Sequence, residues 1–109
     1  MGSVRLLEYV DPEGRSPYGI WFESLNAPAA AKVTLAVYQL AAGNRSNVKG
    51  VGSGALERKI DFGPGYRVYF AKDGETVLLL LGGGTKQRQQ HAIETAKERW
   101  VAYRRRKST

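Results

Sequence analysis

The sequence contains no cysteine and a single histidine among its 109 residues. The absence of cysteine excludes a disulfide framework, a thiol nucleophile and a cysteine-ligated zinc site, and one histidine argues against a histidine metal cluster. The longest apolar run, residues 77–81, is far too short to cross a bilayer, and the N-terminus lacks the apolar core of a signal peptide. We therefore expect a cytoplasmic protein with no metal, no cofactor and no membrane partner.

The sequence does contain enough apolar residues for one folded domain, together with an uneven positive charge. Hydrophobic residues make up 42% of the chain, and the length suits a single domain over residues 1–109. Of the formal net charge of +7, residues 86–109 contribute +6, from eight Lys or Arg against two Glu. This asymmetry is typical of a domain that binds nucleic acid or another polyanion. The alternative is that the charge only keeps the protein soluble and that residues 104–109 form a frayed tail.

Local sequence signals predict an α+β protein with the element order β-α-α-β-β-β-α. Ser16 and Asn26 are suitable N-caps for two consecutive helices, and Gly43 is a suitable stop for the second, so this pair should form a helical hairpin. The glycine-rich residues 44–54 are expected to be a mobile surface loop. The remaining elements predicted are strands over residues 4–10, 55–62, 66–72 and 76–82, and a final basic helix that begins around residue 87.

Turn residues separate the predicted strands of the second half. Residues 63–65, Gly-Pro-Gly, suit a tight connection, and Asp73-Gly74 is a strong signal for a two-residue hairpin loop. Three consecutive glycines, residues 82–84, are expected to end the last strand. The three strands should therefore form an antiparallel meander.

The predicted strand that begins at Tyr66 contains one arginine, Arg67. The alternation of a strand places Tyr66 and Val68 on one face, and Arg67 and Tyr69 on the other. An arginine beside an aromatic ring is suited to hold a phosphate or a stacked base. The alternative is a solvated outer face with a structural ion pair.

Three segments carry a family likeness: VKGVG at residues 48–52, IDFGPGYRVYF at residues 60–70 and GGTKQRQQ at residues 83–90. With the order of elements, they resemble the addiction-module killer proteins, which are HigB-like toxins of the RelE/ParE superfamily. The likeness covers nearly the whole chain. It implies a RelE-like fold with an N-terminal helical hairpin packed on a mainly antiparallel sheet, and a C-terminal helix.

The same resemblance implies a toxin of a type II toxin-antitoxin system. Most toxins of this superfamily are endoribonucleases that cut messenger RNA in the ribosomal A site, whereas the ParE branch inhibits DNA gyrase. The implied partners are a cognate antitoxin, such as a HigA-like helix-turn-helix protein, and messenger RNA on the ribosome. The chain departs from the family pattern at Ala92, where an aspartate is usual, and at Arg58, where an apolar residue is usual. Arg58 would add positive charge near the expected RNA cleft, where it would either strengthen contact with RNA or only occupy a sheet edge.

Metal-independent RNA cleavage needs a base for the 2′-hydroxyl, cations around the phosphate and a proton source for the leaving oxygen. Strand alternation places Glu57 and Lys59 on one face of their strand. Glu57 is the candidate base. Nearby cations would stabilise its charged form and make it a weak base, so its larger contribution would be to orient the 2′-hydroxyl. The alternative is a cross-strand ion pair between Glu57 and Arg67 with a structural role.

The start of the last helix supplies the other candidates. Lys86 and Arg88 lie where cations oppose the helix dipole, and a phosphate bound there would account for both. The alternative is that an exposed turn tolerates two cations. Histidine is the side chain best suited to proton donation near neutral pH, so His91 is a candidate general acid; otherwise it supplies only positive charge.

The predicted site therefore divides by role, with Glu57, Arg67, Lys86 and His91 as catalytic residues and Arg58, Lys59, Tyr69 and Arg88 as RNA-binding residues. Three functions remain open at this point: an RNA-cleaving toxin, a gyrase inhibitor without chemistry of its own, and a degenerate toxin that only binds its antitoxin.

Overall fold

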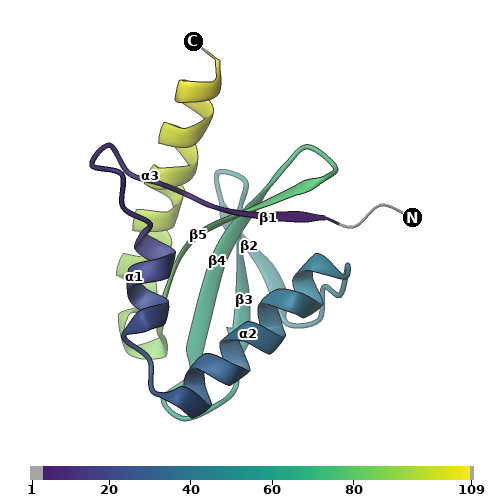
Figure 1. The fold of residues 1–109 in the computed structure, drawn as a ribbon, viewed down its shortest axis with the longest axis vertical. Helices are drawn as coiled ribbons and strands as arrows, with labels where there is room; N and C mark the ends of the chain where they lie inside the picture. Colours follow the sequence, from purple (N-terminus) through teal and green to yellow (C-terminus); the bar gives the residue numbers. More distant parts are fainter. Residues whose placement is uncertain (1–3, 109) are drawn as a thin grey trace.

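The computed structural model describes residues 4–108, so the ends of the predicted domain, residues 1–3 and 109, lie outside the described residues. The fold is a compact α+β structure in which a five-stranded mixed sheet separates two helical layers (Figure 1). The elements in chain order are β1 (Arg5–Glu8), α1 (Pro17–Glu23), α2 (Ala27–Ala41), β2 (Val48–Gly52), β3 (Ala55–Ile60), β4 (Tyr66–Asp73), β5 (Val77–Thr85), a short 3-10 turn η1 (Lys86–Arg88) and α3 (Gln89–Lys107).

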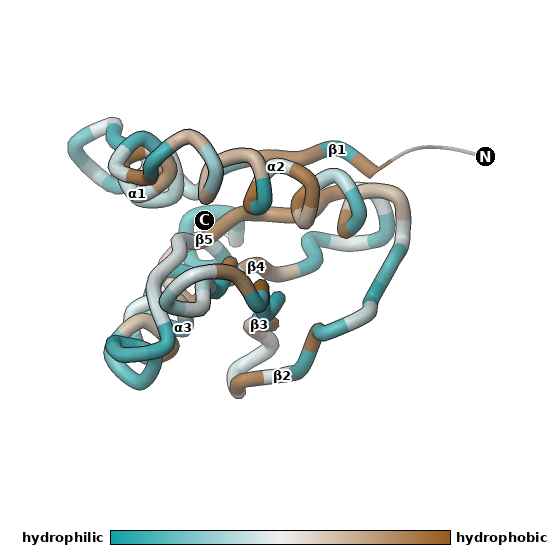
Figure 2. Tube along the Cα trace, turned by 90° about the horizontal axis from the view of Figure 1, so that it is seen from below, coloured by the Kyte–Doolittle hydropathy of each residue, from teal (hydrophilic) through white to brown (hydrophobic). Residues whose placement is uncertain are grey.

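The strands are arranged in the order β1-β5-β4-β3-β2. The pairs β2/β3, β3/β4 and β4/β5 are antiparallel, as the predicted meander requires, whereas β1 runs parallel to β5. Figure 2 shows α1 and α2 on one side of the sheet and α3 on the other. Among the described residues, no helix has the length and hydrophobicity that a membrane span requires.

The two predicted helices are present, together with their caps. The Ser16 side chain accepts a hydrogen bond from the Gly19 amide at 2.9 Å, and the Asn26 side chain accepts one from the Ala29 amide at 2.9 Å. Gly43 follows α2 with a φ of +94°, a value that glycine adopts without the steric cost of a Cβ atom. The local chemistry of these caps is sufficient to set both helix starts.

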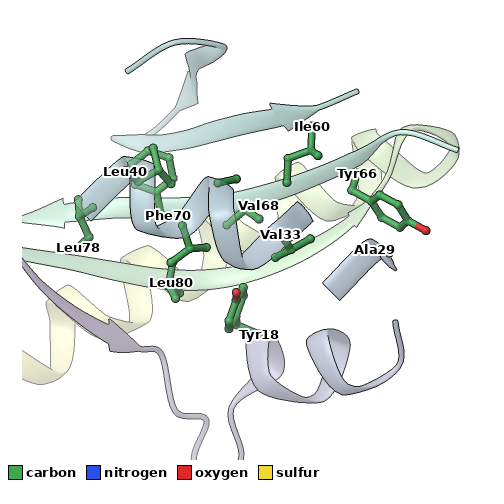
Figure 3. Close-up of a cluster of buried hydrophobic side chains, with 12 residues drawn as sticks. Tyr18, Ala29, Val33, Leu40, Ile60, Tyr66, Val68, Phe70, Leu78 and Leu80 are labelled. Carbon is green, nitrogen blue, oxygen red and sulfur yellow. The ribbon is translucent and has the colours of Figure 1, made fainter. Parts of the chain in front are cut away.

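The larger of two hydrophobic clusters lies between the sheet and the layer formed by α1 and α2. Side chains of α1 and α2 pack here against alternate residues of β3, β4 and β5, as Figure 3 shows. Burial of Tyr66, Val68 and Phe70 on this face agrees with the predicted strand alternation. The second cluster lies under α3, where Ala96 and Trp100 cover the opposite face.

The prediction of a mobile loop over residues 44–54 is wrong, because this segment contains β2. β2 pairs with β3 through Lys49 opposite Glu57, with an irregularity between Gly50 and Gly52. Three of its residues have low strand propensity, and the pairing depends on backbone hydrogen bonds to the edge of a sheet that the rest of the chain provides. The sequence alone gives no sign of that edge.

Two further boundaries differ from prediction. β5 does not end at the glycines but continues to Thr85, because residues 82–84 pair with the arginine-containing part of β4. The β4/β5 connection is three residues long, since β4 ends at Asp73 and β5 begins at Val77.

The C-terminal residues, for which a frayed tail was the alternative interpretation, are helical to Lys107. Lys107 Nζ lies 2.7 Å from Asp73 Oδ2, and the Arg106 guanidinium donates to the Val10 carbonyl at 2.9 Å. These contacts join the end of α3 to β4 and to the segment after β1. The basic segment is therefore an ordered helix, which projects beyond the sheet at its C-terminal end (Figure 1).

Candidate functional site

Glu57 of β3 is the centre of a polar network on the α3 side of the sheet. Its Oε2 accepts hydrogen bonds from the Tyr69 hydroxyl and from Gln89 Nε2, both at 2.9 Å. Its Oε1 lies 3.8 Å from Lys49 Nζ and 4.0 Å from Arg67 Nε. One carboxylate therefore joins β2, β4 and the first residue of α3.

The geometry of Glu57 resembles that of an ion-pair partner more than that of an accessible base. The residue is 2% exposed, and one of its two oxygens already accepts two hydrogen bonds. Burial, followed by the hydrogen bond to Glu57, raises the pKa of Tyr69, so its phenol remains a proton donor to the carboxylate. The predicted Glu57–Arg67 contact is present as a diagonal pair, because the residues directly opposite are Tyr69 for Glu57 and Lys59 for Arg67.

Arg67 lies on the predicted face of β4, but that face is covered rather than solvated. The residue is 5% exposed because α3 packs across the sheet here. Its Nε has no hydrogen-bond partner in the described structure, and its Nη1 makes only a long contact of 3.5 Å to the Tyr66 carbonyl. A guanidinium has five N–H donors, so Arg67 retains capacity to bind an anion.

Lys86 lies beside this guanidinium. The Lys86 amide donates to the Gly65 carbonyl at 3.0 Å, and a Cβ atom added to Gly65 would lie 3.4 Å from Arg67 Nη1 and 3.5 Å from the Lys86 Cβ. The two cationic residues thus flank one glycine of the turn before β4. Lys59, opposite Arg67 on β3, is half exposed and pairs with Asp61 at 3.5 Å.

Arg58 is not part of this cluster, so its predicted placement beside the RNA cleft is wrong. It projects toward the α2 face, where its Nη2 donates to Gln39 Oε1 at 2.6 Å and its Nη1 donates to the Lys59 carbonyl. Burial lowers the pKa of Arg58. The Arg58 side chain joins α2 to β3 through these hydrogen bonds, which accounts for its burial. Strand alternation places it on the opposite face of β3 from Glu57.

A groove of about 410 Å³ opens between α1 and α3, over the end of β5. Arg88 of η1 and His91 of α3 line it on one side, and Trp21 of α1 lines it on the other. Tyr69 belongs to both regions, because its ring lines the groove while its hydroxyl donates to Glu57. His91 therefore lines the groove, which Tyr69 of the Glu57 network also lines.

Several members of these two regions were not predicted as site residues, among them Lys49, Gln89 and Trp21. Lys49 falls in the segment interpreted as a loop, and neither Gln89 nor Trp21 was predicted to have a role in the site. A strand assignment for residues 48–52 would have placed Lys49 beside Glu57. No three His, Asp or Glu side chains within residues 4–108 are grouped as metal ligands.

Comparison with known proteins gives one informative match. No protein-family model matches the chain. An "Uncharacterized protein" of Haemophilus influenzae is 38% identical over 78 residues, which are 71% of this chain and 79% of that protein. Identity at this level over most of both chains establishes common ancestry, and the chain belongs to the same family as this Haemophilus influenzae protein.

Proposed function

We propose that this protein is a HigB-like toxin of the RelE/ParE superfamily that cleaves messenger RNA on the ribosome without a metal. On this proposal it acts in the cytoplasm and is neutralised by a small cognate antitoxin. The observation that carries the proposal is Arg67, a buried guanidinium whose Nε lies 4.0 Å from Glu57 without forming a hydrogen bond, and which lies beside Lys86. A cation held out of water with unused donors is suited to bind a phosphate more tightly as charge develops on it.

The proposed reaction is attack of a ribose 2′-oxygen on the adjacent phosphorus. The 2′-hydroxyl gives up its proton to water as the new P–O bond forms, a cyclic phosphate results as the bond to the 5′-oxygen breaks, and the 5′-oxygen takes up a proton from water or from His91. Arg67 and Lys86 would stabilise the charge on the phosphoryl oxygens, which is the largest contribution that such a site makes. Glu57 holds Arg67 in place and offers only Oε1 to a hydroxyl, since Oε2 is occupied.

A second candidate function is supported by the burial of Glu57. A side chain 2% exposed is a poor general base, and the candidate acid His91 lines a groove rather than the Glu57 network. A gyrase inhibitor without chemistry needs a cationic surface and no base. This alternative therefore predicts that Arg67 and Lys86 bind a partner rather than a reacting phosphate.

Expression of the chain without an antitoxin tests the proposal. We expect growth arrest, with ribosome-bound messenger RNAs shortened at sites that primer extension maps. Arg67→Met should remove most of this effect while circular dichroism shows a folded protein. Arg58→Met is the matched control, because it replaces a buried arginine of the neighbouring strand on the opposite face of the sheet.

Three results would contradict the proposal. Intact transcripts together with accumulated cleaved DNA would favour the gyrase inhibitor. Equal toxicity of Arg67→Met and the wild-type chain would remove Arg67 from the site. Normal growth on expression of a folded chain would leave a protein that only binds an antitoxin.

A further inference from the structure

The groove between α1 and α3 has a distinctive composition. Trp21 and Tyr66 supply aromatic rings, and Arg88, His91 and Arg99 supply cationic or proton-donating groups. No Asp or Glu lines the groove in the part of the chain that the structure describes. Its volume of about 410 Å³ lies within the range of small-molecule sites in proteins.

The groove exists because β1 leaves part of β5 uncovered. β1 pairs with β5 only over Val77–Leu80, so the last residues of β5 have no strand on that side. Figure 2 shows α1 and α3 on the two sides of the sheet at this edge.

The glycines of β5 let both helices approach closely. A Cβ atom on Gly83 would lie 2.3 Å from Trp21 ring carbons, and one on Gly82 would lie 2.5 Å from Arg99 Nη1. Arg99 Nη1 is fixed by donating to the Leu81 carbonyl at 2.8 Å. Trp21 and Arg99 therefore line a groove that is built by packing and does not require a loop to close.

We propose that this groove binds a single nucleobase, that of the nucleotide next to the phosphate held by Arg67 and Lys86. This inference rests on the proposed function and assigns a subsite to it. Aromatic rings and arginines line the same groove, and both suit any base, since every base has a π face that stacks on rings and on guanidinium planes. Lys86 lies between Thr85 and Arg88, which both line the groove, so a nucleotide bound at Lys86 has the groove beside it.

An extended acidic peptide is the other occupant that a cationic groove suggests. The base fits better because the groove carries aromatic rings as well as cations. A polypeptide carboxylate would need the cations but would make no use of the Trp21 ring.

A binding experiment with a non-cleavable oligonucleotide separates these occupants. The probe is a 2′-O-methyl tetranucleotide, compared with the same oligonucleotide containing one abasic position and with hexaglutamate. Calorimetry gives affinities, and tryptophan fluorescence reports contact with Trp21, since the other tryptophan, Trp100 of α3, is buried against the sheet. We expect quenching by the tetranucleotide and, for the best-placed abasic position, an affinity roughly 5- to 100-fold lower, the range that stacking of one base supplies.

Two variants test whether the loss of affinity at the abasic position arises from the groove. In Trp21→Leu, the abasic and intact oligonucleotides should bind within about twofold of each other. Tyr38→Leu is the control, because Tyr38 is an exposed aromatic residue of α2 that lies outside the groove. Should Trp21→Leu be unstable, the abasic comparison on the wild-type chain still decides the question.

Equal binding of the abasic and intact oligonucleotides at every position would overturn the base subsite. Quenching by hexaglutamate without quenching by the oligonucleotide would overturn it in favour of an acidic protein partner. Neither result bears on growth arrest or on the cleavage of transcripts, so a chain that still cuts messenger RNA would retain the proposed function and lose only the subsite.

Discussion

Removing Glu57 and removing Arg67 should change the free energy of unfolding by very different amounts. Glu57 has four partners: two hydrogen bonds at 2.9 Å and two ion pairs at 3.8 and 4.0 Å. Arg67 has the ion pair with Glu57 and one long contact to the Tyr66 carbonyl. Loss of Glu57 therefore leaves a buried cation without a counter-charge, whereas loss of Arg67 leaves a carboxylate that is still bonded.

The magnitudes follow from this asymmetry. Breaking a buried pair so that one charge is left uncompensated costs about 3 to 5 kcal/mol, and the 4.0 Å separation favours the lower end for Glu57→Gln. Arg67→Met keeps the apolar stem and removes a poorly paired charge, so its free energy of unfolding should change by less than about 1 kcal/mol. With a urea m-value of about 1.5 kcal/mol/M, Glu57→Gln should lower the urea midpoint by roughly 2 M.

Urea denaturation followed by circular dichroism measures both values, and the double variant supplies the critical comparison. Because Glu57→Gln with Arg67→Met contains no orphaned cation, it should be more stable than Glu57→Gln alone by about 2 kcal/mol. Equal destabilisation by the two single variants, or a double variant whose loss equals their sum, would refute this reasoning.

Three other perturbations test particular contacts. Gly83→Ala should lower stability by about 2 to 3 kcal/mol and red-shift tryptophan emission, because its Cβ would lie 2.3 Å from the Trp21 ring; an unchanged melting temperature would contradict this packing. The hydrogen bond from Lys107 is the main cause that lowers the pKa of Asp73 below its ordinary value of 3.8. The Asp73 carboxylate therefore stabilises the fold fully above pH 3.8, and this stabilisation is lost as the pH falls through the pKa of the folded state. Asp73→Asn should therefore cost about 1 kcal/mol at pH 7 and less once the pH falls below the folded pKa of Asp73, and a pH-independent difference would exclude the ion pair as its cause. If His91 donates a proton, His91→Gln should slow RNA cleavage by roughly 100-fold with unchanged RNA affinity, and near-normal cleavage by His91→Arg would show that only positive charge is needed.

Much of the fold could be predicted from local sequence because its causes are local. The Ser16 and Asn26 caps act on amides three residues away, and the Gly63 and Gly65 positions of the turn before β4 both have positive φ values. Strand alternation correctly separated Arg67 and Tyr69 from Tyr66 and Val68, since the side-chain period of a strand follows from its covalent geometry. These features need no information from distant parts of the chain.

The candidate site was predicted in part. Sequence placed Glu57, Lys59, Arg67 and Lys86 near one another through strand pairing and the turn that precedes the last helix. It could not give the burial of Glu57 and Arg67, because burial depends on α3 packing across that face. His91 was expected beside the same carboxylate, but the position of α3 on the sheet directs it to the groove instead.

Tertiary structure alone decided the features that arise from contacts between distant segments. β2 is a strand only because β3 offers an edge. β5 continues through its glycines, where local rules would end a strand, and the missing side chains leave the space that Trp21 and Arg99 occupy. The physical reason is the same in both cases. Caps, turns and alternation are set within a few residues, whereas the charge environment of Arg67 and the groove beside it depend on which helices cover the sheet and where β1 stops.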